Sequence, residues 1–131
     1  IKLAIKTKGI DRVCVVTDAF RGAGMPPGVY TFGPKNGQEA VVQDGISVMP
    51  DRTGYASGVV RMKDHIKTLT KLVGLSLIDA VRMATIVPAR IIGVDDRMGS
   101  LEVGKDANMI ITDDDMEIDA TIVNGSVLSP N

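Results

Sequence analysis

The chain has 131 residues, of which 44% are apolar, and its 15 basic and 16 acidic residues leave a net charge of −1. This length fits one domain or a piece of a larger one, with enough apolar residues for a packed core. Because there is no basic surplus and only 3% of residues are aromatic, the composition argues against a nucleic-acid partner. No apolar run approaches transmembrane length, so we expect no membrane partner either. The single cysteine, Cys14, excludes an internal disulfide framework and favours a reducing compartment, so we expect a cytoplasmic protein.

The N-terminal part of the chain is predicted to contain a short helix, a buried strand and a loop. Residues 1–8 read as a helix that Gly9 ends. Residues 12–17 read as a buried strand, because their apolar residues run on without alternation. This strand ends on Asp18, and the following sequence, RGAGMPPGVY, is too rich in glycine and proline to continue either element.

The middle of the chain predicts a small antiparallel sheet. The segments VYTF, EAVVQ and ISVM are typical of short strands, and the turn sequences PKNG and DG separate them. We therefore expect a hairpin or meander here. A second glycine-bearing loop, MPDRTGYASGVV, leads from this sheet into the next predicted helix.

Three helices and a β-rich tail are predicted to follow. Apolar residues at 62, 66, 69 and 73 form a helical stripe that Gly74 ends. Ser76 and Asp79 form a capping pair for the second helix. Pro88 fits the first turn of a third helix, which Gly93 ends. The segments ANMIIT and IDATIVNGSVL then read as strands, with an acidic turn between them.

These elements do not make a self-contained architecture. A buried strand of the parallel type needs neighbours on both sides, and the predicted elements do not supply them. The chain also begins in mid-pattern with IKLAIKTKG and without a methionine. We therefore expect it to be a piece of a longer α/β protein.

Asp18 is the candidate catalytic residue. A buried strand that carries an acid at its C-terminal tip is how a parallel α/β barrel presents a catalytic group. Aspartate is also a common turn former or helix cap after an ordinary strand, so the residue type alone leaves both interpretations open.

The tail resembles a known superfamily. The segment MATIVPARIIGVDDRMGSLEVGKDANMIITDDDMEIDATIVNG is similar to the C-terminal signature of the amidohydrolases, in which a helical turn precedes a G-S-L-x-x-G-K-D-A-(D/N) loop. The front half, with VVTDAFRGAGMPPGVYTFG, VVQDGISVM and TGYASGVVRM, resembles the N-acetylglucosamine-6-phosphate deacetylase family. The resemblance runs over essentially the whole chain but covers only the C-terminal part of the family's length.

The resemblance implies an α/β fold. Residues 1–98 would be the C-terminal part of a metal-dependent (β/α)8 catalytic barrel with a β-hairpin insert. Residues 99–131 would be strands of a small β-sandwich domain. The implied activity is the removal of acetate from N-acetylglucosamine 6-phosphate, in amino-sugar catabolism. The implied ligand is a small amino-sugar phosphate. Because a piece of a barrel exposes sheet edges and apolar faces, we also expect a homo-oligomer.

The resemblance also implies roles for individual residues. Asp18 matches the catalytic aspartate, and Tyr55, Ala56 and Ser57 match a loop that contacts the substrate. That loop reads ASG here, where many members of the family read AGS. No metal ligand of the family has a counterpart in this chain. The divalent metal, expected to be zinc, would be held by a glutamate and two histidines upstream of Ile1, and this chain alone should be inactive.

The chemistry implied for Asp18 is proton transfer. In this family a divalent metal acidifies a bound water, and the carboxylate accepts that water's proton. The same carboxylate can then hand the proton to the departing amine. Two alternatives stay open. The protein could be another amidohydrolase, such as a cyclic amidase or a deaminase, or a non-catalytic interaction module in which Asp18 is only a cap.

The remaining chemically notable residues have structural interpretations. His65, the only histidine, reads as a surface residue beside the helical stripe, because metal sites usually need several ligands. The acidic run of residues 113–115 lacks the spacing of a calcium loop and reads as a solvated turn. Cys14 is expected to be an inert core thiol. Lys105 and Asp106 are expected to be turn residues with a local ion pair.

Overall fold

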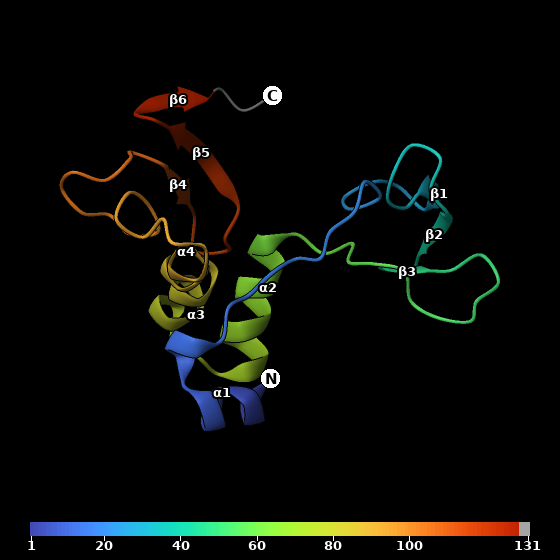
Figure 1. Ribbon diagram of the computed structural model, residues 1–131, viewed down its shortest axis with the longest axis horizontal. Helices are drawn as coiled ribbons and strands as arrows, with labels where there is room; N and C mark the ends of the chain where they lie inside the picture. The colour runs from blue at the N-terminus through green and yellow to red at the C-terminus, as the bar shows by residue number, and fades with distance from the viewer. Residues whose placement is uncertain (129–131) are drawn as a thin grey trace. The chain divides into compact units, whose positions relative to one another are not determined.

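The computed structural model describes residues 1–128 (Figure 1), and the chain divides into two compact units. The first unit combines residues 1–15 with the chain from residue 66 onward, and the second unit is residues 16–65. In chain order the elements are α1 (Lys2–Lys8), η1 (Ile10–Arg12), β1 (Gly28–Thr31), β2 (Glu39–Gln43), β3 (Ile46–Val48), α2 (Met62–Thr68), η2 (Leu69–Val73), α3 (Leu77–Ala84), α4 (Ile86–Ile92), β4 (Met109–Thr112), β5 (Ile118–Val123) and β6 (Ser126–Leu128). The expected division near residue 98 stays a prediction.

In the first unit, α1 and α4 end at the glycines that the sequence indicates, and α3 begins at its predicted cap. The backbone N–H of Gly9 donates to the carbonyl of Ile5 at 2.8 Å and ends α1. The Ser76 hydroxyl accepts the N–H of Asp79 at 3.1 Å at the start of α3, which is the predicted cap. Gly93 ends α4 with φ +72°, a conformation that glycine adopts without steric cost. These predictions are confirmed.

The predicted stripe of residues 62–73 is helical throughout, but not as one regular helix. α2 continues directly into η2, which is a π-helix, and Gly74 ends it in the left-handed conformation. The core of this unit forms where Ile66 and Leu69 pack with Ala80 of α3. All three residues are buried, so the stripe faces the core as expected.

The first unit also holds an antiparallel sheet with the strand order β4–β5–β6. Its register pairs Met109 with Ile122, and a bulge lies between Ile111 and Thr112. Asn124 and Gly125 connect β5 to β6 with φ angles of +49° and +78°. Two consecutive positive φ values are typical of the tight hairpin turn that an Asn-Gly pair favours. The predicted β-rich tail is therefore confirmed.

The second unit is built on the antiparallel sheet β1–β2–β3, as the sequence predicts. Tyr30 pairs with Ala40 in its first hairpin. Asp44 and Gly45 form the second turn, with φ angles of +52° and +76°. Ala40 is fully buried, and Ser47 of β3 is only 2% exposed.

The prediction of a buried strand over residues 12–17 is wrong. No strand is assigned there, and Val16 is 67% exposed. The backbone N–H of Val15 donates to the carbonyl of Met83 at 2.9 Å, which is a contact with a helix and not a sheet ladder. A strand of this kind is stabilised by neighbours on both sides, and no strand among residues 1–128 pairs with it.

None of the helices in this described part is long and apolar enough to cross a membrane.

Candidate functional site

Asp18 lies in the second unit, directly after the apolar run of residues 12–17, and it is exposed. Its φ angle is +51°, in the left-handed region that aspartate tolerates better than most residues. The Thr17 hydroxyl accepts the N–H of Ala19 at 3.3 Å across the turn. Within residues 1–128 the carboxylate makes no ion pair or side-chain hydrogen bond, and it is therefore available to another group.

The backbone of Asp18 is held by the second glycine-bearing loop. Its carbonyl oxygen accepts the N–H of Gly58 at 2.8 Å and also the hydroxyl of Ser57. Ala19 and Gly58 form a parallel bridge, and the N–H of Phe20 donates to the carbonyl of Gly58 at 3.2 Å. The structure thus brings together Asp18 and Ser57, two residues for which the family resemblance implies roles.

Gly58 makes this approach possible. A Cβ atom at this position would lie 2.2 Å from the carbonyl oxygen of Thr17, a separation that no side chain can occupy. The order ASG places the glycine where the two segments touch. It also places the hydroxyl one position earlier, where Ser57 reaches Asp18. In this chain the glycine of ASG therefore lies at the point of closest approach between the two segments.

The other two predicted substrate residues lie in the same loop. Tyr55 is 80% exposed and forms an antiparallel bridge with Val48 of β3. The N–H of Ala56 donates to the carbonyl of Ser47 at 3.0 Å. The backbone of the loop is thus anchored on β3, while the ring of Tyr55 remains accessible.

Ser47 is a residue that the sequence did not single out. Its hydroxyl donates to the carbonyl of Ser57 at 2.8 Å and accepts the N–H of Ser57 at 3.0 Å. In β3 the apolar Ile46 is 41% exposed and the polar Ser47 is buried, the reverse of the usual pattern. No local motif would have revealed this, because the partner of Ser47 lies in another segment.

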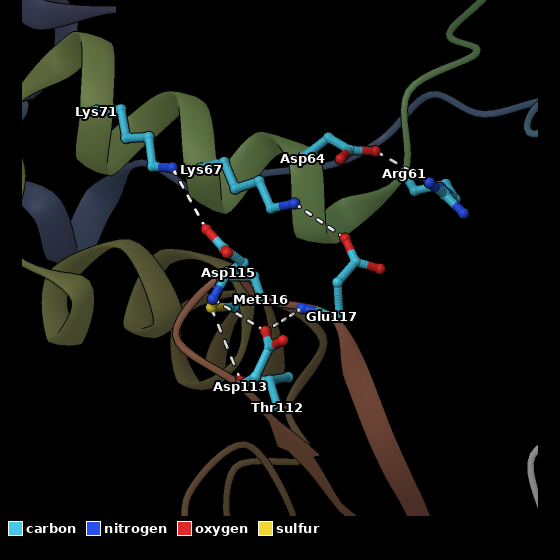
Figure 2. Close-up of polar contacts among 9 residues, drawn as sticks. All are labelled: Arg61, Asp64, Lys67, Lys71, Thr112, Asp113, Asp115, Met116 and Glu117. Atoms are coloured by element: carbon cyan, nitrogen blue, oxygen red, sulfur yellow. Dashed lines mark hydrogen bonds and ion pairs between the residues drawn. The ribbon is translucent and has the colours of Figure 1, made fainter.

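The described residues do not form a metal centre. Residues 1–128 contain no group of three or more His, Cys, Asp or Glu side chains that could hold a metal ion. In the acidic turn of the first unit, the carboxylates of Asp113 and Asp115 contact other groups of the chain (Figure 2). The Asp113 carboxylate accepts the N–H groups of Asp115 and Glu117, each at 2.9 Å.

Two lysines form ion pairs with the carboxylates of this turn. Lys67 lies 3.1 Å from the Glu117 carboxylate and Lys71 lies 3.9 Å from the Asp115 carboxylate (Figure 2). The interpretation of residues 113–115 as a turn is confirmed, with lysines of α2 and η2 as its partners. Met116, which has a φ of +59°, packs against the core of the first unit.

Two residues differ in detail from their predicted surroundings. His65 of α2 is half-buried, and its Nε2 atom is buried without a hydrogen-bond partner in the described part of the chain, so it is not a simple surface residue. Cys14 is a free thiol that is half-buried, less than the core position expected for it.

The tail loop contains local ion pairs, as expected. Lys105 and Asp106, however, pair with other residues and not with each other. Lys105 bonds the Ser100 hydroxyl at 2.6 Å and lies 3.5 Å from the Glu102 carboxylate. Asp106 lies 3.6 Å from Arg97. The hydrogen bond from Ser100, together with the charge of Lys105, lowers the pKa of Glu102.

Comparison with known proteins places this arrangement in a family. Residues 39–128 match the model of the amidohydrolase family. The chain belongs to the amidohydrolase family. Among its relatives, the N-acetylglucosamine-6-phosphate deacetylase of Haemophilus influenzae is 35% identical over 95% of this chain, which spans 32% of that protein. The putative N-acetylgalactosamine-6-phosphate deacetylase of Escherichia coli K12 is 31% identical over 91% of this chain, which spans 69% of it.

A solved amidohydrolase structure is similar as well. The crystal structure of N-acetylglucosamine-6-phosphate deacetylase from Pasteurella multocida matches with a TM-score of 0.88 and 34% identity. The match covers 98% of this chain and 33% of that one. The chain thus spans about a third of the length of this structure and of most of the curated relatives that it matches.

Proposed function

We propose that the intact protein hydrolyses the amide of N-acetylglucosamine 6-phosphate and releases acetate and glucosamine 6-phosphate. The observation that carries this proposal is the 35% identity, over 95% of the chain, to a deacetylase of that substrate. In this proposal residues 1–98 belong to a (β/α)8 barrel and residues 99–131 to a small β-sandwich. The protein would be a cytoplasmic homo-oligomer.

Asp18 is the general acid–base group of this proposal. Its carboxylate would accept a proton from the water that attacks the amide carbon, and would then give that proton to the departing amine. Three features support the role: the carboxylate is exposed, it is unpaired within residues 1–128, and its backbone is held by hydrogen bonds from Ser57 and Gly58. A fixed backbone limits the directions in which the carboxylate can point.

The loop that contains Tyr55, Ala56 and Ser57 would contact the sugar. The Ser57 hydroxyl already donates a hydrogen bond to the carbonyl of Asp18, so its main role would be structural. The exposed ring of Tyr55 offers an apolar face for the sugar and a hydroxyl for its polar groups. We therefore propose Tyr55 as the side chain of this loop that touches the substrate.

A divalent metal, expected to be zinc, belongs to the proposal at the level of the family. It would supply an acidified water as the nucleophile. The described residues do not fit such a centre, since they lack a cluster of ligands. The metal would therefore be held by residues outside this chain.

A second substrate deserves a direct comparison, because one relative is named for the galactose epimer. The experiment is to measure acetate release by the intact protein from N-acetylglucosamine 6-phosphate and from N-acetylgalactosamine 6-phosphate. A cyclic amide serves as the third substrate, and its turnover is measured as loss of the substrate, because ring opening releases no acetate. We expect the highest kcat/KM with the glucosamine compound. Preference for its epimer would reassign the substrate, and turnover of the cyclic amide alone would move the protein to another branch of the family.

A further inference from the structure

Ser47 is a polar residue in a position that an apolar residue usually occupies. It lies on β3 with 2% of its surface exposed, between Ile46 and Val48. Burying a hydroxyl costs free energy unless it is hydrogen-bonded, so the hydrogen-bond partners of Ser47 indicate its role.

Both partners of the Ser47 hydroxyl are on the backbone of Ser57. The hydroxyl donates to the carbonyl at 2.8 Å and accepts the N–H at 3.0 Å. The backbone carbonyl of Ser47 also accepts the N–H of Ala56 at 3.0 Å. Because these bonds reach two consecutive residues of the loop, they restrict both its position and its orientation.

Ser57 in turn acts on Asp18. The Ser57 hydroxyl and the Gly58 N–H, at 2.8 Å, both donate to the carbonyl of Asp18. Asp18 has a φ of +51°, a conformation that persists where the surroundings hold it. The backbone conformation sets the direction of the Cα–Cβ bond, and hence where the carboxylate can reach.

We propose that Ser47 is a positioning residue for Asp18, and that it acts through Ser57 and Gly58. The inference rests on the proposed function, in which the Asp18 carboxylate transfers the proton. Ser47 itself is buried and is not expected to touch the substrate. Its hydroxyl holds the loop of Ser57 and Gly58 against Asp18 and thereby fixes the direction of the Asp18 carboxylate.

The test compares three substitutions in the intact protein. Ser47→Ala removes the hydroxyl, Ser47→Cys keeps the approximate volume but hydrogen-bonds poorly, and Ser47→Thr keeps the hydroxyl. We expect kcat to fall about 10- to 100-fold in the first two variants, because a small misplacement of a reacting group is costly. KM should rise by less than kcat falls, and Ser47→Thr should recover much of the lost kcat.

A second measurement reports on the loop without using activity. Backbone hydrogen exchange at Ser57 and Gly58 should speed up in Ser47→Ala and Ser47→Cys, because their N–H groups are held by this network. Ser76→Ala is the matched control. It removes a serine hydroxyl that also satisfies a backbone N–H, but in the first unit. It should lower thermal stability and leave both kcat and the exchange of the loop unchanged.

The outcomes separate this inference from the function on which it rests. Unchanged kcat in both Ser47→Ala and Ser47→Cys, or a rise in KM alone, would overturn the positioning role. Unchanged exchange at Ser57 and Gly58 would overturn it as well. If Asp18→Asn abolishes turnover in the same assay, a negative result for the Ser47 variants does not affect the proposed function. Turnover that survives Asp18→Asn would overturn the function of Asp18, and this inference with it.

Discussion

The hydroxyl of Ser57 donates a hydrogen bond to the backbone carbonyl of Asp18, 39 positions earlier in the chain. This bond joins the proposed proton-transfer residue to the proposed substrate loop. The Gly58 N–H reinforces it at 2.8 Å on the same oxygen. A change on either segment is therefore expected to affect the other.

Asp18→Asn in the intact protein should lower kcat by at least about 100-fold, because the amide cannot accept the proton. Its metal content should not change, because in the proposed function the metal is held by residues outside this chain and Asp18 transfers the proton. The matched control is Asp44→Asn, which removes the same charge at a φ of +52° in the turn between β2 and β3. The measurement is steady-state acetate release with metal analysis of each variant. Equal losses in the two variants would argue for a general charge effect and against a catalytic Asp18.

Gly58→Ala should destabilise the second unit and reduce turnover. The added Cβ would lie 2.2 Å from the carbonyl oxygen of Thr17, so the loop must move away from Asp18. Overpacking of this kind costs about 1–3 kcal/mol. Gly54→Ala is the control in the same loop, because a Cβ there meets no atom within 4 Å. Thermal unfolding and kcat measure both effects, and a Gly58→Ala protein as stable and active as Gly54→Ala would show that the close approach is not required.

Leu69→Ala should lower the free energy of unfolding by about 2–5 kcal/mol, because it leaves a cavity in a core that cannot fully collapse. Leu69 is 3% exposed and packs with Ile66 and Ala80. Leu72 lies three residues later in η2 and is 74% exposed, so Leu72→Ala should change stability by no more than about 0.5 kcal/mol. Denaturant unfolding of the parent protein, Leu69→Ala and Leu72→Ala measures these changes. Equal losses would mean that the π-helix presents a different face to the core.

The pKa of Asp51 should lie below its ordinary value of 3.8, because its carboxylate accepts the N–H and the hydroxyl of Thr53. The lowered pKa favours the charged carboxylate in the folded state. Its stabilising effect is therefore present above pH 3.8 and is lost as the pH falls through the folded-state pKa. Thr53→Val should raise the pKa of Asp51 part of the way back, since the N–H bond remains.

Carbon-detected NMR titration of the Asp51 carboxyl measures this shift. Thr70→Val is the control, because the Thr70 hydroxyl donates to the carbonyl of Ile66 and not to a carboxylate. The titration of Asp51 should be the same in this variant as in the parent. An Asp51 pKa that Thr53→Val leaves unmoved would mean that the side-chain bond contributes nothing.

Zinc added to the chain of residues 1–131 should find no tight one-to-one site. The described residues 1–128 hold no cluster of three metal-ligating side chains, and the Asp113 carboxylate is occupied by the amides of its own turn. Calorimetric titration measures this, with the intact protein after removal of its metal as the positive control. A tight site in the chain alone would contradict the proposal that the ligands lie outside it.

The sequence by itself determined the features that depend on neighbouring residues. The cap at Ser76, the helix ends at Gly9, Gly74 and Gly93, and the turn at Asp44 were all predicted, because each follows from the conformation or hydrogen bonds of a few adjacent residues. The stripe that buries Ile66 and Leu69 was also predicted, since helical spacing is a local property.

Only the tertiary structure decided what depends on distant segments. The apolar run of residues 12–17 suggested a strand, yet a ladder needs partners that the described residues do not provide. The buried Ser47, the glycine required at position 58 and the bond from Ser57 to Asp18 arise where three separate segments meet. Contacts of this kind leave no periodic or local mark in a sequence, because the partners can lie 10 or 39 positions apart and are brought together only by the folded chain.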